Sequence, residues 1–220
     1  TQCQNLWEDY LDIRKLTFDQ RICELASELL GTKAIRLWHD QALLKESGGR
    51  ETDPHHDQPY WPIKETSTIT AWIPLCDINE TNGQLGFYPG SHKIQDKKFI
   101  NIFSGKVDEK EFLKESNLDS DEVIYQDLQA GDVSFHHGLT FHRAKPNLSK
   151  SDRIVHTAIF FADGSTRGDD KFHFSVDRPN IKVGEKIQSD VTPLAYPINN
   201  LPKRPENGIS DDFMGYKMLG

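Results

Sequence analysis

The chain has 220 residues and a formal net charge of −8, and its basic residues occur in runs no longer than pairs such as 97–98 and 203–204. This charge argues against a nucleic-acid partner, and no apolar run approaches the roughly 18 residues that a membrane-spanning helix needs. Three widely spaced cysteines without a CxxC pair are typical of a reducing compartment, so we expect a cytoplasmic protein. The length predicts a single domain over residues 1–220, and a chain that starts at Thr1 leaves room for a missing N-terminal portion.

The first predicted element is an amphipathic helix. Thr17 and Gln20 match the pattern of a capping box, and apolar residues then recur at helical spacing as far as Gly31, a typical helix end. From Ala34 the pattern becomes extended, and residues 35–45 are predicted to form a strand. One face of this strand carries Leu37, His39, Gln41, Leu43 and Lys45.

Most of the remaining elements are predicted strands. Segments rich in β-branched and aromatic residues occupy residues 66–76, 83–90, 133–137 and 153–161. The charged region 104–127 is predicted to be an insertion with a short helix, and residues after about 163 are expected to be mostly irregular. Many short strands with one strong helix favour a mainly β fold, an antiparallel jelly roll with N-terminal helical support.

Two segments contain residue types that bind metals. His55 and Asp57 are two residues apart, so in an extended segment both side chains point to the same side while that of His56 points away. A third ligand must come from a distant strand, and His142 is the preferred candidate. Two neighbouring histidines are alternatives for this position: His136 and His137. Two imidazoles and one carboxylate can hold one face of an octahedral Fe(II) and leave the opposite face open.

Segments around these residues carry a family resemblance. Residues 38–45, 55–61, 71–75, 82–92, 131–132 and 142–153 together resemble the phytanoyl-CoA dioxygenase family of Fe(II)/2-oxoglutarate-dependent oxygenases. The matched segments lie within residues 38–161, over half of the chain. The resemblance implies a double-stranded β-helix, the cupin-like form of the jelly roll. It also implies an iron-binding triad that is catalytic: His55, Asp57 and His142.

The resemblance further implies which residues bind the cosubstrate 2-oxoglutarate. Arg153 stands eleven residues after His142, where the family has the guanidinium that pairs with the distal carboxylate. A planar, always charged fork suits that role because it can bind a carboxylate through two hydrogen bonds. Lys45 resembles a second cosubstrate-binding cation, and Trp72 resembles an aromatic wall of the same pocket. Gln41 shares a strand face with Lys45 and is a further candidate contact.

One departure from the family lies directly after the distal histidine. Many members have Gly-Ser there, and the serine hydroxyl assists cosubstrate binding, whereas this chain has Arg143-Ala144. The change removes one hydrogen bond, which is worth about 1 kcal/mol. We therefore expect a modest affinity for 2-oxoglutarate.

The implied activity is hydroxylation of a small organic molecule with Fe(II), 2-oxoglutarate and O2, with release of succinate and CO2. The carboxylate of Asp57 favours oxygenation over halogenation, because related halogenases have a small residue there to admit chloride. Desaturation, ring closure and endoperoxide formation are alternatives, as is a cupin-like protein that binds metal or ligand without turnover. Arg153 and Lys45 argue against the latter, because a simple binding module needs no dicarboxylate clamp. The lack of a dense basic patch for the phosphates of CoA favours a free metabolite or a natural-product intermediate as substrate.

The other histidines and aromatic residues near these motifs receive more ordinary interpretations. His39 and His156 are interpreted as structural, because a histidine on a strand is more often a hydrogen-bonded core residue. Tyr60 and Trp61 follow the first metal-binding segment directly. They either line the substrate cavity or simply cover the mouth of the barrel.

Overall fold

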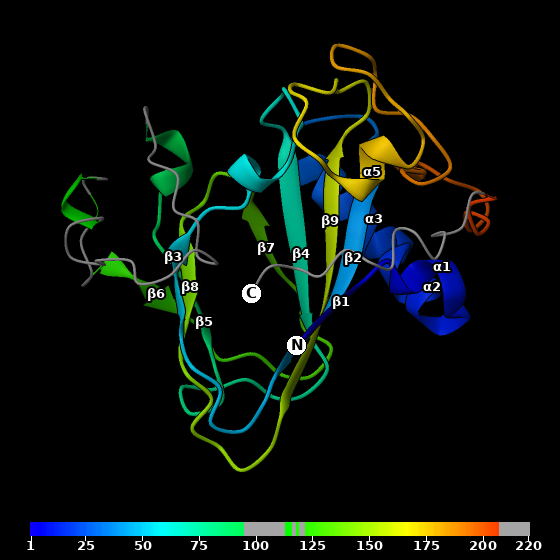
Figure 1. Cartoon of the computed structure of the whole chain (residues 1–220). Coiled ribbons are helices and arrows are strands. Elements are labelled where there is room, and N and C mark those ends of the chain that lie inside the picture. Colours follow the sequence, from blue (N-terminus) through cyan, green and yellow to red (C-terminus); the bar gives the residue numbers. More distant parts are fainter. Residues whose placement is uncertain (95–112, 116–117, 119–121, 207–220) are drawn as a thin grey trace.

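Two antiparallel sheets that face each other make up most of the protein (Figure 1). The computed structural model describes residues 1–94, 113–115, 118 and 122–206. The larger sheet has the strand order β1-β2-β9-β4-β7, with β10 also paired to β2, and the smaller sheet has the order β3-β8-β5-β6. This architecture confirms the expected mainly β jelly roll. The strands are β1 (Gln2–Gln4), β2 (Ile35–Lys45), β3 (Thr52–His55), β4 (Thr68–Pro74), β5 (Leu85–Phe87), β6 (Ile124–Tyr125), β7 (Ser134–His137), β8 (His142–Ala144), β9 (Arg153–Ala162) and β10 (Leu194–Tyr196).

Short helices cover the outer face of the larger sheet. They are α1 (Leu6–Asp9), α2 (Leu11–Thr17) and α3 (Gln20–Leu29). Trp7 and Phe18 are buried beneath them, with ring centroids 5.4 Å apart, and they pack in one cluster with Leu37 and Phe160 of the sheet. Burying side chains of this size contributes about 1.5 to 3 kcal/mol each, so this layer anchors the outside of the sheet and leaves its inner face for the site.

The start of α3 differs from the expected capping box. Asp19, not Thr17, is the N-cap residue, and its side chain accepts a hydrogen bond from the backbone N–H of Arg21 at 3.0 Å. Thr17 is the last residue of α2, and its hydroxyl donates to the carboxylate of Asp40 on β2 at 3.0 Å. The local pattern failed because the hydroxyl of Thr17 forms a tertiary contact instead of a cap.

An irregularity in β2 decides which of its side chains face inward. β2 pairs with β9 from Lys45 opposite Arg153 to His39 opposite Ile159, and the register shifts between Leu37 and His39. From His39 onward the alternate residues line the space between the sheets as expected, but Leu37 packs in the outer cluster. A bulge adds one residue to a strand and so turns the following side chains to the other face.

The C-terminal part of the described chain is mostly irregular, as expected, but it contains α5 (Phe174–Asp177). Most of the predicted insertion at residues 104–127 lies outside the described residues. Within the described part of the chain, no helix has the length and apolar character needed to cross a membrane.

Candidate active site

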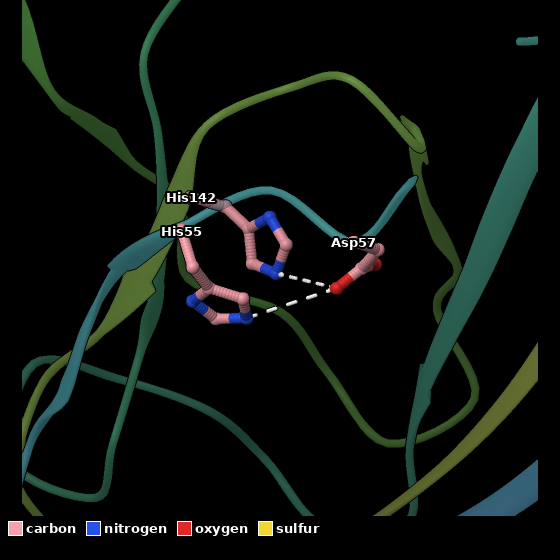
Figure 2. Close-up of side chains that lie close together, drawn as sticks. All are labelled: His55, Asp57 and His142. Atoms are coloured by element: carbon pink, nitrogen blue, oxygen red, sulfur yellow. Dashed lines mark ion pairs between the residues drawn. The ribbon is translucent and has the colours of Figure 1, made fainter. Parts of the chain in front are cut away.

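Three side chains from separate parts of the sequence converge between the two sheets (Figure 2). His55 ends β3 and pairs directly with His142, the first residue of β8, so their rings lie with centroids 4.3 Å apart. Asp57 begins the turn after β3 and points its carboxylate toward both rings. One nitrogen or oxygen atom of each residue lies within 4.8 Å of the others, which is a spacing that a single metal ion can bridge.

The two oxygens of the Asp57 carboxylate have different partners. Oδ1 lies 3.7 Å from Nε2 of His55 and 3.8 Å from Nε2 of His142. Oδ2 accepts hydrogen bonds from Nε2 of His136 at 3.3 Å and from the hydroxyl of Thr70 at 3.4 Å. Burial alone would raise the pKa of Asp57, but His142, His136 and His55 together hold that pKa below its ordinary value. The carboxylate is therefore ionised, with Oδ1 facing the two histidines.

The two histidines each present Nε2 to the same point. Nδ1 of His55 donates to the carbonyl oxygen of Asp53 at 2.8 Å, and Nδ1 of His142 donates to that of Thr140 at 3.0 Å. With the ring proton on Nδ1, the lone pair of Nε2 faces Asp57. Burial lowers the pKa of both histidines to about 4, so both are neutral near pH 7. Neutral imidazoles fixed by a backbone acceptor are the form that binds metals.

These three residues lie in a pocket of about 710 Å³ that also contains two cations, the buried Arg153 and the half-buried Lys45. The guanidinium of Arg153 donates to the carbonyl oxygen of Gly83 at 3.0 Å and lies 5.5 Å from the centre of the Trp72 ring. Nζ of Lys45 donates to the carbonyl oxygen of Lys145 at 2.9 Å. Among the described residues, no carboxylate forms an ion pair with either cation.

Among the described residues, burial outweighs the attraction that opposite charges exert on these two cations. Burial lowers the pKa of Arg153 to about 10. Burial, followed by repulsion from Arg153, lowers the pKa of Lys45 to about 8. A buried charge without a partner is costly, so this end of the pocket favours an anionic ligand.

The pocket floor consists of rows of residues that lie opposite one another across the larger sheet. The cation row contains Lys45 and Arg153. The middle row contains Gln41, Thr157 and Trp72, and the imidazole row contains His39, Ile159, Thr70 and His136. Along β9 the backbone positions of the cation row and the imidazole row are six residues apart, which is about 20 Å of strand. The side chain of Arg153 shortens this distance, because its guanidinium lies 5.5 Å from the ring of Trp72 in the middle row. Asp57 contacts the imidazole row, so the three converging side chains lie near one part of the pocket and the cations near another.

The structure brings all the predicted site residues to this pocket: His55, Asp57, His142, Arg153, Lys45, Trp72 and Gln41. Of the two alternative third ligands, His136 hydrogen-bonds to Asp57 from the opposite sheet. His137 lies on the other face of β7, where its Nδ1 accepts from the backbone N–H of Leu139. Arg143, at the departure from the family pattern, also lines the pocket and donates to Glu51 at 3.3 Å.

Two histidines that line the pocket were not anticipated as site residues. His39 lines the pocket although its sequence position suggested a structural role. Its place on the same strand face as Gln41 was the signal that could have identified it. His173 lies in the irregular C-terminal part and also lines the pocket. The sequence signal that could have identified it is its position between two aromatic residues, Phe172 and Phe174.

A jelly roll that gathers two neutral imidazoles and one carboxylate between its sheets has the donor set typical of mononuclear non-haem iron oxygenases. Comparison with protein families agrees with this class. The chain belongs to the phytanoyl-CoA dioxygenase (PhyH) family, whose model matches residues 4–155. This membership confirms the resemblance found in the sequence.

Individual relatives are distant. A probable alpha-ketoglutarate-dependent hypophosphite dioxygenase of Stutzerimonas stutzeri is 29% identical over 149 residues, which cover 66% of this chain and 50% of that protein. Phytanoyl-CoA dioxygenase 1 of Oryza sativa subsp. japonica is 28% identical over 141 residues, covering 64% of this chain and 49% of that protein. The chain thus spans about half the length of these curated relatives.

Solved structures show the same fold. The alpha ketoglutarate dependent carbocyclase SnoK from nogalamycin biosynthesis superposes with a TM-score of 0.75 at 25% identity, over 88% of this chain and 75% of that one. The epimerase SnoN, solved in complex with Fe3+, alpha ketoglutarate and nogalamycin RO, gives a TM-score of 0.72 at 26% identity, over 88% of this chain and 77% of that one.

Proposed function

We propose that the protein is an Fe(II)/2-oxoglutarate-dependent oxygenase that hydroxylates a small organic molecule. His55, Asp57 and His142 hold the iron in this proposal, and Arg153 and Lys45 bind the cosubstrate. The observation that carries it is the sharing of one pocket by a converging His-Asp-His group and two cations that have no carboxylate partner among the described residues. Family membership and the iron and alpha ketoglutarate bound to SnoN support the same assignment.

The donor set fits iron. Two neutral Nε2 atoms and one ionised Oδ1 satisfy three positions on one side of a divalent cation. The backbone carbonyls that fix the two imidazoles and the hydrogen bonds that fix Oδ2 of Asp57 hold the donors in place before the metal arrives. Iron bound there with 2-oxoglutarate and O2 supplies an oxidant strong enough to remove hydrogen from an unactivated carbon.

The cation row supplies the cosubstrate clamp. The guanidinium of Arg153 is held by the carbonyl of Gly83 and packs beside Trp72, so its planar fork is already oriented for a carboxylate. Lys45 adds a second positive charge next to it. Gln41 and Trp72, in the middle row, line the space between the clamp and the metal ligands and are the proposed side walls of the cosubstrate site.

Other reaction outcomes are open to the same oxidant. SnoK is a carbocyclase and SnoN an epimerase, and both share this fold. Hydroxylation adds one oxygen atom to the substrate, ring closure removes two hydrogen atoms, and epimerisation leaves the mass unchanged. The product mass therefore separates hydroxylation from these alternatives once a substrate is found.

An anaerobic titration tests the proposal. Fe(II) and 2-oxoglutarate are added to the protein while the visible charge-transfer band of the iron chelate is followed. The band should form with the parent protein, vanish in His55→Ala and require far more 2-oxoglutarate in Arg153→Ala. Arg21→Ala is the matched control, because Arg21 lies on α3 outside the pocket with a 90% exposed side chain. Folded protein that binds Fe(II) but never shows the band would favour a binding protein without turnover.

A further inference from the structure

The end of the pocket beyond the imidazole row is walled by rings. We call it the ring chamber, and its described walls are His39, Tyr60, Trp61, Phe172, His173 and Phe174. Residues 172–174 lead into α5, which lies near the end of β9 that is remote from Arg153 (Figure 1). The ring of His39 lies 5.5 Å from the rings of both His173 and Phe174, so the strand and the α5 segment close around one space.

The ring chamber differs from the rest of the pocket in charge. Among the described residues that line the pocket, the charged ones other than Asp57 belong to the cation end: Lys45, Glu46, Arg50, Arg143 and Arg153. The chamber walls contain only aromatic and imidazole side chains. Burial lowers the pKa of His39 to about 4 and that of His173 well below its ordinary value, so both are uncharged near pH 7. Asp57 and Arg167 act electrostatically on His39 and His173, but neither is a chamber wall, so a charged substrate group placed here would lose its hydration without a direct ion pair to the described walls.

His173 offers a fixed hydrogen-bond donor in this chamber. The backbone N–H of Ser175 donates to its Nδ1 at 3.2 Å, which places the ring proton on Nε2. One face of the ring stacks on Trp38, with centroids 4.3 Å apart and planes at 24°. Within the described part of the chain, no acceptor receives the Nε2–H of His173. The donor is therefore oriented by the protein and left for a ligand.

His39 gives a second, independent sign of a ligand site. Its side chain is 1% exposed, and its Nδ1 lies 3.4 Å from the carbonyl oxygen of Asp40 and 3.5 Å from the amide nitrogen of Gln41. Its Nε2 has no hydrogen-bond partner among the described residues. Because His39 lines the pocket, a ligand bound there can supply the hydrogen bond that Nε2 lacks among the described residues.

We propose that the ring chamber is the substrate site and that it selects an uncharged, flat ring compound whose carbonyl or hydroxyl oxygen accepts a hydrogen bond from Nε2 of His173. This inference rests on the proposed function, because it names the substrate class of the same pocket. Aromatic walls favour a flat ring by stacking and edge contacts, and the single fixed donor sets its orientation. The substrate and 2-oxoglutarate then occupy opposite ends of the pocket, and the metal ligands lie beside the imidazole row.

Binding of simple probes tests the inference under anaerobic conditions with Fe(II) and 2-oxoglutarate present. The probes are 1-tetralone, a fused ring with one carbonyl; tetralin, the same ring without oxygen; and 1-naphthoate, a charged analogue. Calorimetry should show that 1-tetralone binds more tightly than tetralin, that 1-naphthoate binds much more weakly, and that 1-tetralone does not displace 2-oxoglutarate.

The variant His173→Asn isolates the donor. Asparagine keeps an oxygen that can accept from Ser175 N–H, so the start of α5 stays capped, but it loses the ring and its Nε2–H. The dissociation constant for 1-tetralone should rise about fivefold or more, and that for tetralin should change far less. His92→Asn, on the exposed His92, is the control and should leave both unchanged. Melting temperatures check that each variant is folded.

The outcomes separate this inference from the proposed function. If the iron chelate forms but 1-tetralone does not bind up to its solubility limit, or 1-naphthoate binds equally well, the ring chamber is not a site for uncharged rings and the oxygenase proposal stands. If His173→Asn lost affinity for 1-tetralone and for tetralin equally, Nε2 of His173 would not be the hydrogen-bond donor to the substrate. If 1-tetralone binds with the expected dependence on His173 but no chelate forms, the chamber stands and the oxygenase proposal fails.

Discussion

Nε2 of His136 donates a hydrogen bond to Oδ2 of Asp57 at a distance of 3.3 Å. The two residues come from opposite sheets, since His136 lies on β7 and Asp57 follows β3. This contact and the one from Thr70 occupy Oδ2, which turns Oδ1 toward His55 and His142. The larger sheet thus orients a carboxylate that the smaller sheet carries.

Replacing His136 by phenylalanine should weaken Fe(II) binding. The ring volume is nearly kept, but Oδ2 of Asp57 loses its donor and the carboxylate becomes free to rotate. Loss of a group that orients a metal ligand costs about 10- to 100-fold in metal affinity. A titration with Co(II) in place of oxygen-sensitive Fe(II) measures the effect. His137→Phe is the control, because His137 lies outside the pocket and contacts Leu139 instead; an equal loss in both variants would show that the effect is only structural.

Gly83 should be required for the cosubstrate clamp. It has a φ of +89°, and a Cβ atom there would lie 2.9 Å from Cδ of Lys45, while its carbonyl oxygen accepts from Arg153. Gly83→Ala therefore strains the backbone by about 1 kcal/mol and also displaces Lys45. We expect a lower melting temperature together with a higher dissociation constant for 2-oxoglutarate.

A second glycine separates these two effects. Gly184 has a φ of +87°, and a Cβ atom added there would have no described neighbour within 4 Å, so Gly184→Ala introduces the backbone strain alone. It should lower the melting temperature by a similar amount and leave 2-oxoglutarate affinity unchanged. If Gly83→Ala binds 2-oxoglutarate as well as Gly184→Ala does, the clamp does not depend on this close approach.

The affinity for 2-oxoglutarate should fall as the pH rises through about 8. Burial and the neighbouring Arg153 lower the pKa of Lys45 to about 8, so its ammonium is present below this pH and is lost above it. A neutral amine attracts a carboxylate less, and the dissociation constant rises by at most about tenfold per pH unit. Chelate titrations from pH 7 to 9 measure the slope. Lys45→Arg keeps its charge in this range, so a slope identical to that of the parent would exclude Lys45 as its source.

The strands that carry the site were predictable because their residues alternate with the period of two that a strand between a core and a pocket requires. β2 has the predicted bounds Ile35–Lys45, and β9 extends the predicted strand by one residue, to Ala162. Alternation also placed Gln41 and Lys45 on one face. The position of Leu37 was wrong because a bulge depends on how β2 pairs with β9, and this pairing has no signature within β2 itself.

The choice among three histidines could not be made from spacing. His136 and His142 are only six residues apart, and the pairing of strands separates them, since His142 lies opposite His55 and His136 lies opposite Thr70. The ring chamber was unpredictable for the same reason. His39 and His173 are far apart in the sequence, and their contact depends on how the irregular segment before α5 folds back over β2.

The buried Asp40 should make the stability of the protein depend on pH. Its side chain is fully buried and accepts from the backbone N–H of Trp7 at 2.9 Å and from the hydroxyl of Thr17 at 3.0 Å. Burial raises the pKa of Asp40 to about 7 from an ordinary value of 3.8. Between these two values the folded protein holds a proton that the unfolded chain has released, so this group destabilises the fold progressively as the pH rises from about 4 to about 7.

The variant Asp40→Asn measures this effect, because asparagine resembles the protonated carboxyl. Burial lowers the pKa of the nearby His156 to about 4, which has the opposite effect on stability. Because burial and not Asp40 sets this pKa, we expect a nearly equal contribution of His156 in both proteins, although the two side chains lie 3.9 Å apart. From pH 4 to 7 the unfolding free energy of Asp40→Asn, relative to the parent, should rise by up to about 1.4 kcal/mol per pH unit. Urea titrations at several pH values provide the difference, with the exposed Asp170→Asn as a control that stays nearly flat. A flat difference for Asp40→Asn as well would mean that Asp40 stays ionised in the fold and that its hydrogen bonds from Trp7 and Thr17 outweigh its burial.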